Sequence, residues 1–213
     1  ECRMEYDIKE ELEELGLGDH LCCIYKNAAE QFSVLVPYML LGIENHEKCF
    51  YIIEESTKEL VISEFKKAGV DIERYIRSKQ FEFLTKEDTY LKEGSFDPDR
   101  MIGLLKETEK KALNDGYAGL RVTGEMTWIF SGLPGVEKII EYETKLNDFF
   151  PASKATAVCQ YHESRFKPEL LLDVIHTHPT VVVYGQVCEN PYYIPTDVFL
   201  ARMKGNIPVG IYE

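Results

Sequence analysis

The sequence is short of basic residues and of long apolar runs. It has 24 Lys and Arg against 37 Asp and Glu, a formal net charge of −13. Nucleic-acid grooves and anionic membrane surfaces are recognised by clustered basic side chains, so we expect neither as a partner. No apolar run approaches the roughly 18 residues of a membrane span, and the first residues are charged rather than signal-like. We therefore expect a cytoplasmic protein.

The glycine-rich loops of nucleotide-binding folds are also missing. A phosphate loop needs G-x-x-x-x-G-K-[ST] directly after the first strand, but the segment after the first apolar run, KNAAEQF, contains no glycine. The stretch that starts at Gly132, GLPGVEK, has Glu137 in place of the second glycine and follows a later strand. Neither G-x-G-x-x-G after a strand nor G-x-S-x-G occurs. We expect no cofactor, no catalytic residues and no enzymatic activity.

The six cysteines form no C-x-x-C pair. Cys22 and Cys23 are adjacent, so in a strand they would point to opposite faces, and we predict no metal site. Most of the cysteines lie in apolar runs, which is typical of reduced core thiols. A redox or metal sensor that uses Cys22, Cys23 or Cys159 stays open as an alternative. His176 and His178 are expected to be solvated or to cap a helix end.

Strand-like and helix-like segments alternate along the chain. Apolar runs predict strands at 21–25, 48–53, 81–84, 119–125, 154–161 and 180–187. Helical periodicity, a capping box from Ser56 to Glu59 and the Asp97-Pro98 helix start predict helices between them, including one from about 134 to 150. This alternation predicts an α/β fold: a mainly parallel sheet with helices on both faces.

In such a sheet, ligands bind beyond the carboxyl ends of the strands. Glu125 stands at the end of one predicted strand, so it is either a ligand contact or a carboxylate that caps a turn or pairs with an arginine. We expect one cavity for a small, partly apolar ligand, bordered by Glu54, Thr123, Glu125, Trp128 and Tyr161. Secondary candidates are His20, Tyr25, Met126, His162 and Arg165. Taken singly, Met126 and Trp128 also fit core packing, and His20 fits a residue that orders the entry to the first strand.

Seven segments together resemble one family over about 18–199: GDHLCCIY from Gly18, YIIEEST from Tyr51, FDPDRM from Phe96, LRVTGEMTW from Leu120, YETKLNDFF from Tyr142, VCQYHESRF from Val158 and NPYYIP from Asn190. They resemble the methanogen and methylotroph sensory domain, MEDS. The resemblance implies a sensory input module of prokaryotic signalling proteins, proposed to sense small hydrocarbon derivatives.

The resemblance also implies a RecA-like fold that has lost its phosphate loop, with Glu125 at the strand end that carries the acidic group in the ATPases. Residual nucleotide binding stays open as an alternative. Partners implied are an output region, such as a histidine kinase or a DNA-binding region, and a second copy in a homodimer. We expect a linker or helix at 1–17, the sensory domain at 18–200 and an extension at 201–213.

Overall fold

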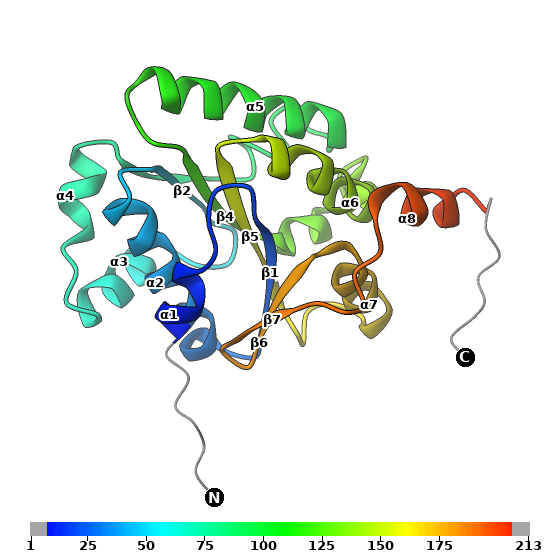
Figure 1. Ribbon diagram of the computed structural model, residues 1–213, viewed down its shortest axis with the longest axis horizontal. Coiled ribbons are helices and arrows are strands. Elements are labelled where there is room, and N and C mark those ends of the chain that lie inside the picture. The colour runs from blue at the N-terminus through cyan, green and yellow to red at the C-terminus, as the bar shows by residue number, and fades with distance from the viewer. Residues whose placement is uncertain (1–7, 206–213) are drawn as a thin grey trace, which may run out of the picture.

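The computed structural model describes residues 8–205 and has a seven-stranded sheet at its centre (Figure 1). The strand order is β3-β2-β4-β5-β1-β6-β7. All neighbours are parallel except β6 and β7. The strands are β1 His20–Tyr25, β2 Lys48–Ile52, β3 Phe81–Leu84, β4 Leu120–Glu125, β5 Ala155–His162, β6 Thr180–Val183 and β7 Gln186–Glu189. The predicted α/β class and mainly parallel sheet are confirmed.

Helices cover both faces of this sheet. One face packs against α1 Ile8–Glu13, α2 Ala28–Glu44, α3 Lys58–Lys67 and α4 Ile72–Arg77. The other packs against α5 Pro98–Asn114, α6 Ile139–Phe149, α7 Pro168–Thr177 and α8 Thr196–Met203. Short 3-10 helices occupy Met126–Ser131, Val136–Lys138 and Phe150–Ala152. Among these described helices, none combines the length and apolar character that a bilayer span requires.

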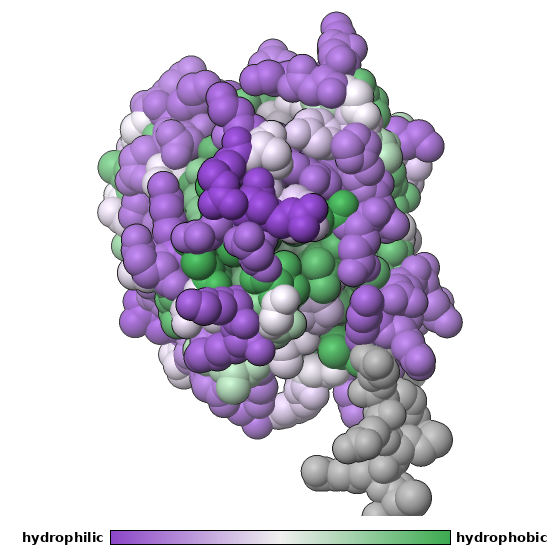
Figure 2. All heavy atoms as spheres, turned by 90° about the vertical axis from the view of Figure 1, so that its left-hand side faces the viewer, coloured by the Kyte–Doolittle hydropathy of each residue, from purple (hydrophilic) through white to green (hydrophobic). Residues whose placement is uncertain are grey.

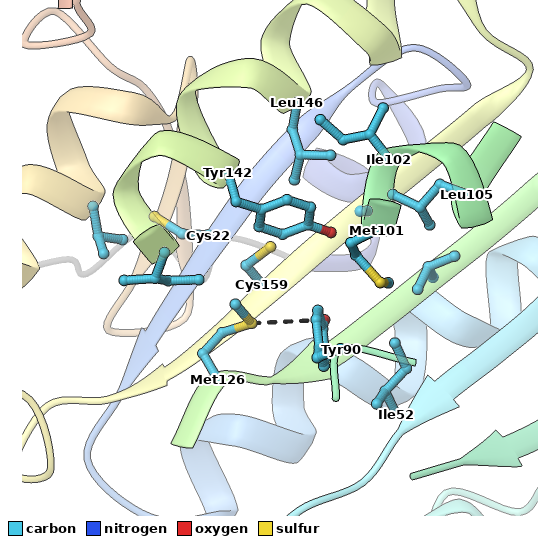
Figure 3. Packing of buried hydrophobic residues seen from close by; sticks show 14 of the residues in the cluster. Cys22, Ile52, Tyr90, Met101, Ile102, Leu105, Met126, Tyr142, Leu146 and Cys159 are labelled. Carbon is cyan, nitrogen blue, oxygen red and sulfur yellow. Dashed lines mark hydrogen bonds between the residues drawn. The ribbon is translucent and has the colours of Figure 1, made fainter. Parts of the chain in front are cut away.

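Side chains alternate along each strand, so the sheet divides the interior into two cores. Val122 and Cys159 point into the core under α5–α8, whose packing is shown in Figure 3. Val158 and Tyr51 point into the core under α1–α4. Both faces of the central strands are buried, which explains their continuous apolar runs.

The face seen in Figure 2, on the side of α3 and α4, is mostly hydrophilic, with smaller hydrophobic areas between the hydrophilic ones.

Three local expectations need correction. Residues 180–187 form a hairpin rather than one strand, because Tyr184 and Gly185 adopt positive φ values of 52° and 70° and turn the chain. The helix expected from about 134 begins at Ile139, after a 3-10 turn. Thr57, not Ser56, caps α3 by accepting the N–H of Leu60.

The described part of the expected terminal segments is partly helical. Helix α1 lies within the segment expected at 1–17, of which residues 1–7 fall outside the described residues. Helix α8 runs from Thr196 to Met203 and so crosses the expected boundary at 200. Its Phe199 is buried in the core under α5–α8.

Candidate functional site

Glu125, the last residue of β4, holds the loop that follows β2. Its Oε2 accepts backbone N–H bonds from Glu54 at 2.9 Å, Glu55 at 2.6 Å and Ser56 at 2.9 Å. The residue is only 2% exposed. Its other oxygen, Oε1, is buried and has no hydrogen-bond partner within the described residues. The carboxylate therefore pairs within the fold and still presents one free acceptor at the strand ends.

Three secondary candidates lie around the same strand ends. The rings of Tyr25 and His162 meet edge to face, with centroids 5.1 Å apart. Arg165 Nη2 lies 2.7 Å from Glu55 Oε1 and so joins the loop after β5 to the loop after β2. Burial raises the pKa of Tyr25, and the negative charges of Glu125 and Glu55 raise it further. The ends of β1, β2, β4 and β5 thus form one polar, partly buried group.

Thr123 belongs to a buried polar network beneath this group. Its hydroxyl donates to the carbonyl of Val158 at 2.8 Å and accepts from Gln160 Nε2 at 2.9 Å. Gln160 Oε1 in turn accepts from Gln31 at 2.7 Å and from the hydroxyl of Tyr51 at 3.3 Å. These partners rigidify the floor below Glu125. Glu54 contributes its backbone N–H to Glu125, while its side chain pairs with Lys86 at 2.5 Å.

Trp128 and Met126 lie on the opposite face of the sheet. Trp128 is fully buried and stacks on Tyr90, with ring centroids 4.6 Å apart and planes 13° from parallel. The hydroxyl of Tyr90 donates to Met126 Sδ at 3.7 Å. A Cβ on Gly124 would lie 2.3 Å from that hydroxyl, so the close approach that this glycine permits is made by Tyr90. Hence the sheet separates Trp128 from Glu125.

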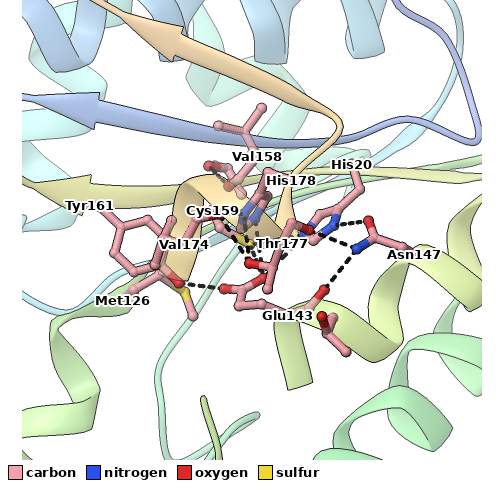
Figure 4. Close-up of polar contacts among 12 residues, drawn as sticks. His20, Met126, Glu143, Asn147, Val158, Cys159, Tyr161, Val174, Thr177 and His178 are labelled. Carbon is pink, nitrogen blue, oxygen red and sulfur yellow. Dashed lines mark hydrogen bonds and ion pairs between the residues drawn. The ribbon is translucent and has the colours of Figure 1, made fainter. Parts of the chain in front are cut away.

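Tyr161 also faces the core under α5–α8, where it joins a buried cluster with His20, Glu143, Cys159 and His178 (Figure 4). Its hydroxyl donates to Glu143 Oε1 at 2.5 Å. Both imidazoles approach the other oxygen, Oε2, with Nε2 of His20 at 3.2 Å and Nε2 of His178 at 3.3 Å. Cys159 Sγ lies 3.5 Å from Oε2 and 3.6 Å from Nε2 of His20. One carboxylate thus organises four side chains from three separate segments.

The charges in this cluster depend on one another. Burial alone would raise the pKa of Glu143, but the charge and hydrogen bond of His178 and the contacts with His20 hold it well below its usual value. Burial would lower the pKa of His178, yet Cys22 and Glu143 keep it raised. The pKa of His20 is lowered by burial and by the charge of His178. Burial raises the pKa of the Cys159 thiol.

Two residues of this cluster were not among the expected site residues. His178 was expected to be solvated or to cap a helix end; it is not solvated, because it is 0% exposed, but it is the C-cap residue of α7 and its Nδ1 lies 2.7 Å from the carbonyl of Val174. Glu143 lies on the apolar face of α6, four residues after Ile139 and three before Leu146, where helical spacing places core residues. A glutamate at a helix position where the apolar spacing predicts a core residue was the feature of the sequence that could have identified Glu143 as a buried site residue. Of the expected candidates, His20 and Tyr161 belong to this cluster, as does the alternative thiol Cys159.

The connection after β1 differs from a phosphate loop in length and in charge. Strand β1 ends at Tyr25 and α2 begins at Ala28, so only Lys26 and Asn27 join them. Asn27 caps the helix by accepting the N–H of Glu30, and Glu30 Oε2 accepts the N–H of Lys26 at 3.0 Å. A carboxylate therefore lies at the helix N-terminus where a phosphate would need to bind.

Comparisons with known proteins give the fold type and the family of the chain. No curated protein sequence matches the chain. Among solved structures, a KaiC-like protein from the hyperthermophilic archaeon Pyrococcus horikoshii is similar, with a TM-score of 0.53 and 14% identity over 78% of this chain and 70% of the other. This likeness shows a RecA-like fold. The family model described as "MEthanogen/methylotroph, DcmR Sensory domain" matches residues 19–179. The chain therefore belongs to the MEDS family of sensory domains.

Proposed function

We propose that the chain is the sensory input module of a prokaryotic signalling protein, without enzymatic activity of its own, and that it binds a small, partly apolar molecule at the carboxyl ends of the strands. The family supports the sensory role. In sheets of this class, ligands bind beyond the carboxyl strand ends. The geometry supports a site there because several strand ends bring polar groups together around one buried carboxylate.

The observation that carries the ligand site is the free Oε1 of Glu125. This atom is buried and has no partner among residues 8–205, while the neighbouring Oε2 accepts three N–H bonds. A buried acceptor without a donor is costly, and a ligand that donates a hydroxyl or amine hydrogen removes that cost. Tyr25, His162 and Arg165 supply aromatic surface and charge beside it. Thr123 supports the site from below, and Glu54 contributes its backbone N–H.

A binding assay with substituted variants tests this proposal. Short-chain alcohols and amines serve as probes, and isothermal titration calorimetry measures their affinity, because the one tryptophan, Trp128, is fully buried on the opposite face of the sheet. Glu125→Gln retains an oxygen for the three N–H groups but replaces the free acceptor with an amide. We expect it to weaken binding about 5- to 150-fold, the equivalent of one buried hydrogen bond, about 1–3 kcal/mol.

The melting temperatures of the same variants distinguish a lost ligand contact from a loss of folding stability. Glu125→Ala leaves three N–H groups without their acceptor and should lower both stability and affinity. Thr123→Val serves as the matched control, because it disturbs the floor of the site without removing the free acceptor. If Glu125→Gln and Glu125→Ala change stability while probe affinity stays at the wild-type value, the carboxylate serves the fold alone and the site assignment fails.

We further propose that the module passes its signal to an output region, such as a histidine kinase or a DNA-binding region, in the cytoplasm. We propose that two copies of the module associate as a homodimer, because RecA-like domains associate through sheet edges and helical faces. The output region would then be presented by a dimer. Light scattering between about 1 and 100 μM, spanning typical association constants, tests the homodimer. A constant monomer mass across that range would remove it.

A further inference from the structure

We propose that His20, Glu143, Cys159 and His178 form a closed metal site for a divalent transition-metal ion of the zinc class. Each residue offers one donor atom, and the four atoms all lie within 4.8 Å of one another. All four side chains are buried (Figure 4). This inference concerns the opposite face of the sheet from Glu125, so it stands independently of the proposed ligand site.

Four of the six separations between donor atoms match tetrahedral coordination, and the other two are at most 4.8 Å. With metal bonds of about 2.0–2.3 Å, nitrogen and oxygen donors lie about 3.3 Å apart and sulfur lies about 3.6 Å from either. In the cluster, Glu143 Oε2 is 3.2 Å from Nε2 of His20 and 3.3 Å from Nε2 of His178. Cys159 Sγ is 3.5 Å from Oε2 and 3.6 Å from Nε2 of His20. Four of the six separations therefore fit without rearrangement.

The imidazoles present the correct nitrogen atoms. Nδ1 of His178 lies 2.7 Å from the backbone carbonyl of Val174, which can only accept, so Nδ1 carries the hydrogen. Nδ1 of His20 lies 2.9 Å from Asn147 Oδ1. The amide of Asn147 is oriented by its Nδ2, which donates to the carbonyls of Thr177 at 2.7 Å and Glu143 at 3.4 Å. Both histidines therefore donate at Nδ1 and direct Nε2 towards the carboxylate.

Without a cation, a protonated His178 has to neutralise the carboxylate, and its Nε2 lies 3.3 Å from Oε2 without a well-aligned hydrogen bond among the described residues. When both imidazoles are neutral, with the hydrogen on Nδ1, each Nε2 points a lone pair towards Oε2. A divalent ion accepts all these lone pairs at once. With one carboxylate and one thiolate it also gives a buried site of zero net charge, which burial favours. Imidazole and thiolate donors favour zinc over magnesium or calcium.

The surroundings supply the outer contacts that metal sites usually have. Metal-binding histidines usually donate their second nitrogen to a carbonyl or carboxylate, as both histidines do here. The hydroxyl of Tyr161 holds Glu143 Oε1 and leaves Oε2 for the ion. Four protein donors leave no open position, which is typical of structural rather than catalytic sites. The ion would join β1, β5, α6 and the segment after α7.

Metal content and cobalt spectroscopy test the site. We expect the purified protein to contain about one zinc-class ion per chain, as four-donor structural sites do. Because the site is buried, the protein is then unfolded in denaturant with chelator and refolded with Co²⁺. The wild type should show the visible bands of tetrahedral cobalt and a near-ultraviolet thiolate-to-cobalt band. Cys159→Ser should lose the thiolate band, and His178→Asn should lower metal content at least about tenfold.

The controls keep a folding defect from imitating a lost ligand. Cys23→Ser alters a buried cysteine of the same strand as His20 that faces the other core, and it should leave the cobalt spectrum unchanged. Asn147→Ala keeps all four ligands and should lower cobalt affinity about 10- to 100-fold. If a variant does not refold, the thiolate band of the wild type still tests for a cysteine ligand. Wild-type protein that carries no ion and binds no cobalt on refolding, or equal spectra in Cys159→Ser and Cys23→Ser, would overturn the proposal.

Discussion

Arg121 of β4 and Glu47, just before β2, form a buried two-point ion pair under α2. Nε of Arg121 donates to Glu47 Oε2 at 2.6 Å and Nη2 donates to Oε1 at 3.3 Å, and both side chains are at most 4% exposed. The guanidinium also lies over the ring of Tyr38. A Cβ on Gly42 would lie 2.5 Å from Arg121 Cδ, so this glycine leaves room for the arginine.

Removing one partner of this pair should be more harmful than removing both. Glu47→Gln leaves a buried guanidinium without its counter-charge, and we expect it to cost about 3–5 kcal/mol of unfolding free energy. The double variant Glu47→Leu/Arg121→Met should cost less than either Glu47→Leu or Arg121→Met alone. Urea denaturation of these two single variants and of the double variant measures this. Additive losses would show that the two charges act independently.

The charge on Asp97 should contribute to stability in a limited pH range. Its Oδ1 accepts the N–H of Arg100 at 2.9 Å and caps α5, and this bond lowers the pKa of the carboxyl below its ordinary value of 3.8. Because the folded-state pKa is the lower one, the stabilisation is present above that ordinary value and is lost as the pH falls through the folded-state value. Asp97→Ala should cost about 1 kcal/mol near neutral pH.

Asp97→Asn separates the cap from its charge, since asparagine caps helices about as well. Unfolding free energies of the wild type and Asp97→Asn are compared at neutral pH and well below pH 4. The advantage of the wild type should shrink in acid. A difference that is the same at both pH values would count against a contribution from the charge.

The thiols should differ strongly in reactivity. Cys188 is exposed, whereas Cys22, Cys23, Cys49 and Cys159 are buried. Burial raises the pKa of Cys49 to about 12, and it raises those of Cys23 and Cys159 as well. Because the thiolate is the reactive form, iodoacetamide should label Cys188 well before these four. Peptide mapping resolves each site, including Cys2, which lies outside the described residues. Labelling of Cys22 or Cys159 as fast as that of Cys188 would favour the redox-sensor alternative.

MgATP should not raise the melting temperature of the protein, and the protein should not hydrolyse ATP. The two-residue connection between β1 and α2 has no glycine, and the carboxylate of Glu30 lies at the helix N-terminus. A thermal shift with MgATP and a phosphate-release assay, each with Glu125→Gln alongside, measure this. Turnover in the wild type that disappears in the variant would revive the nucleotide-binding alternative and contradict a purely sensory role.

The local pattern of the sequence was sufficient for most elements of the fold. Strand Phe81–Leu84 and the Asp97-Pro98 start of α5 lie where the sequence predicts them. Apolar period and capping chemistry act over a few residues, so they can be read without knowledge of distant contacts. The hairpin at Tyr184 and Gly185 was missed because a short apolar run does not reveal a turn at its centre. Family membership followed from segments spread along the chain.

Only the tertiary structure decided which face each site residue occupies and what it contacts. Glu125 and Thr123 point to the face under α1–α4, while Tyr161 lies under α5–α8, because side chains alternate along strands and one residue of difference reverses the face. The partners of Glu125 come from the loop after β2, and those of Glu143 come from β1, β5 and the end of α7. Such contacts join residues far apart in the chain, and no local pattern encodes them. Sequence alone thus located the strand-end carboxylate, whereas packing of α6 and α7 against the sheet created the buried cluster around Glu143.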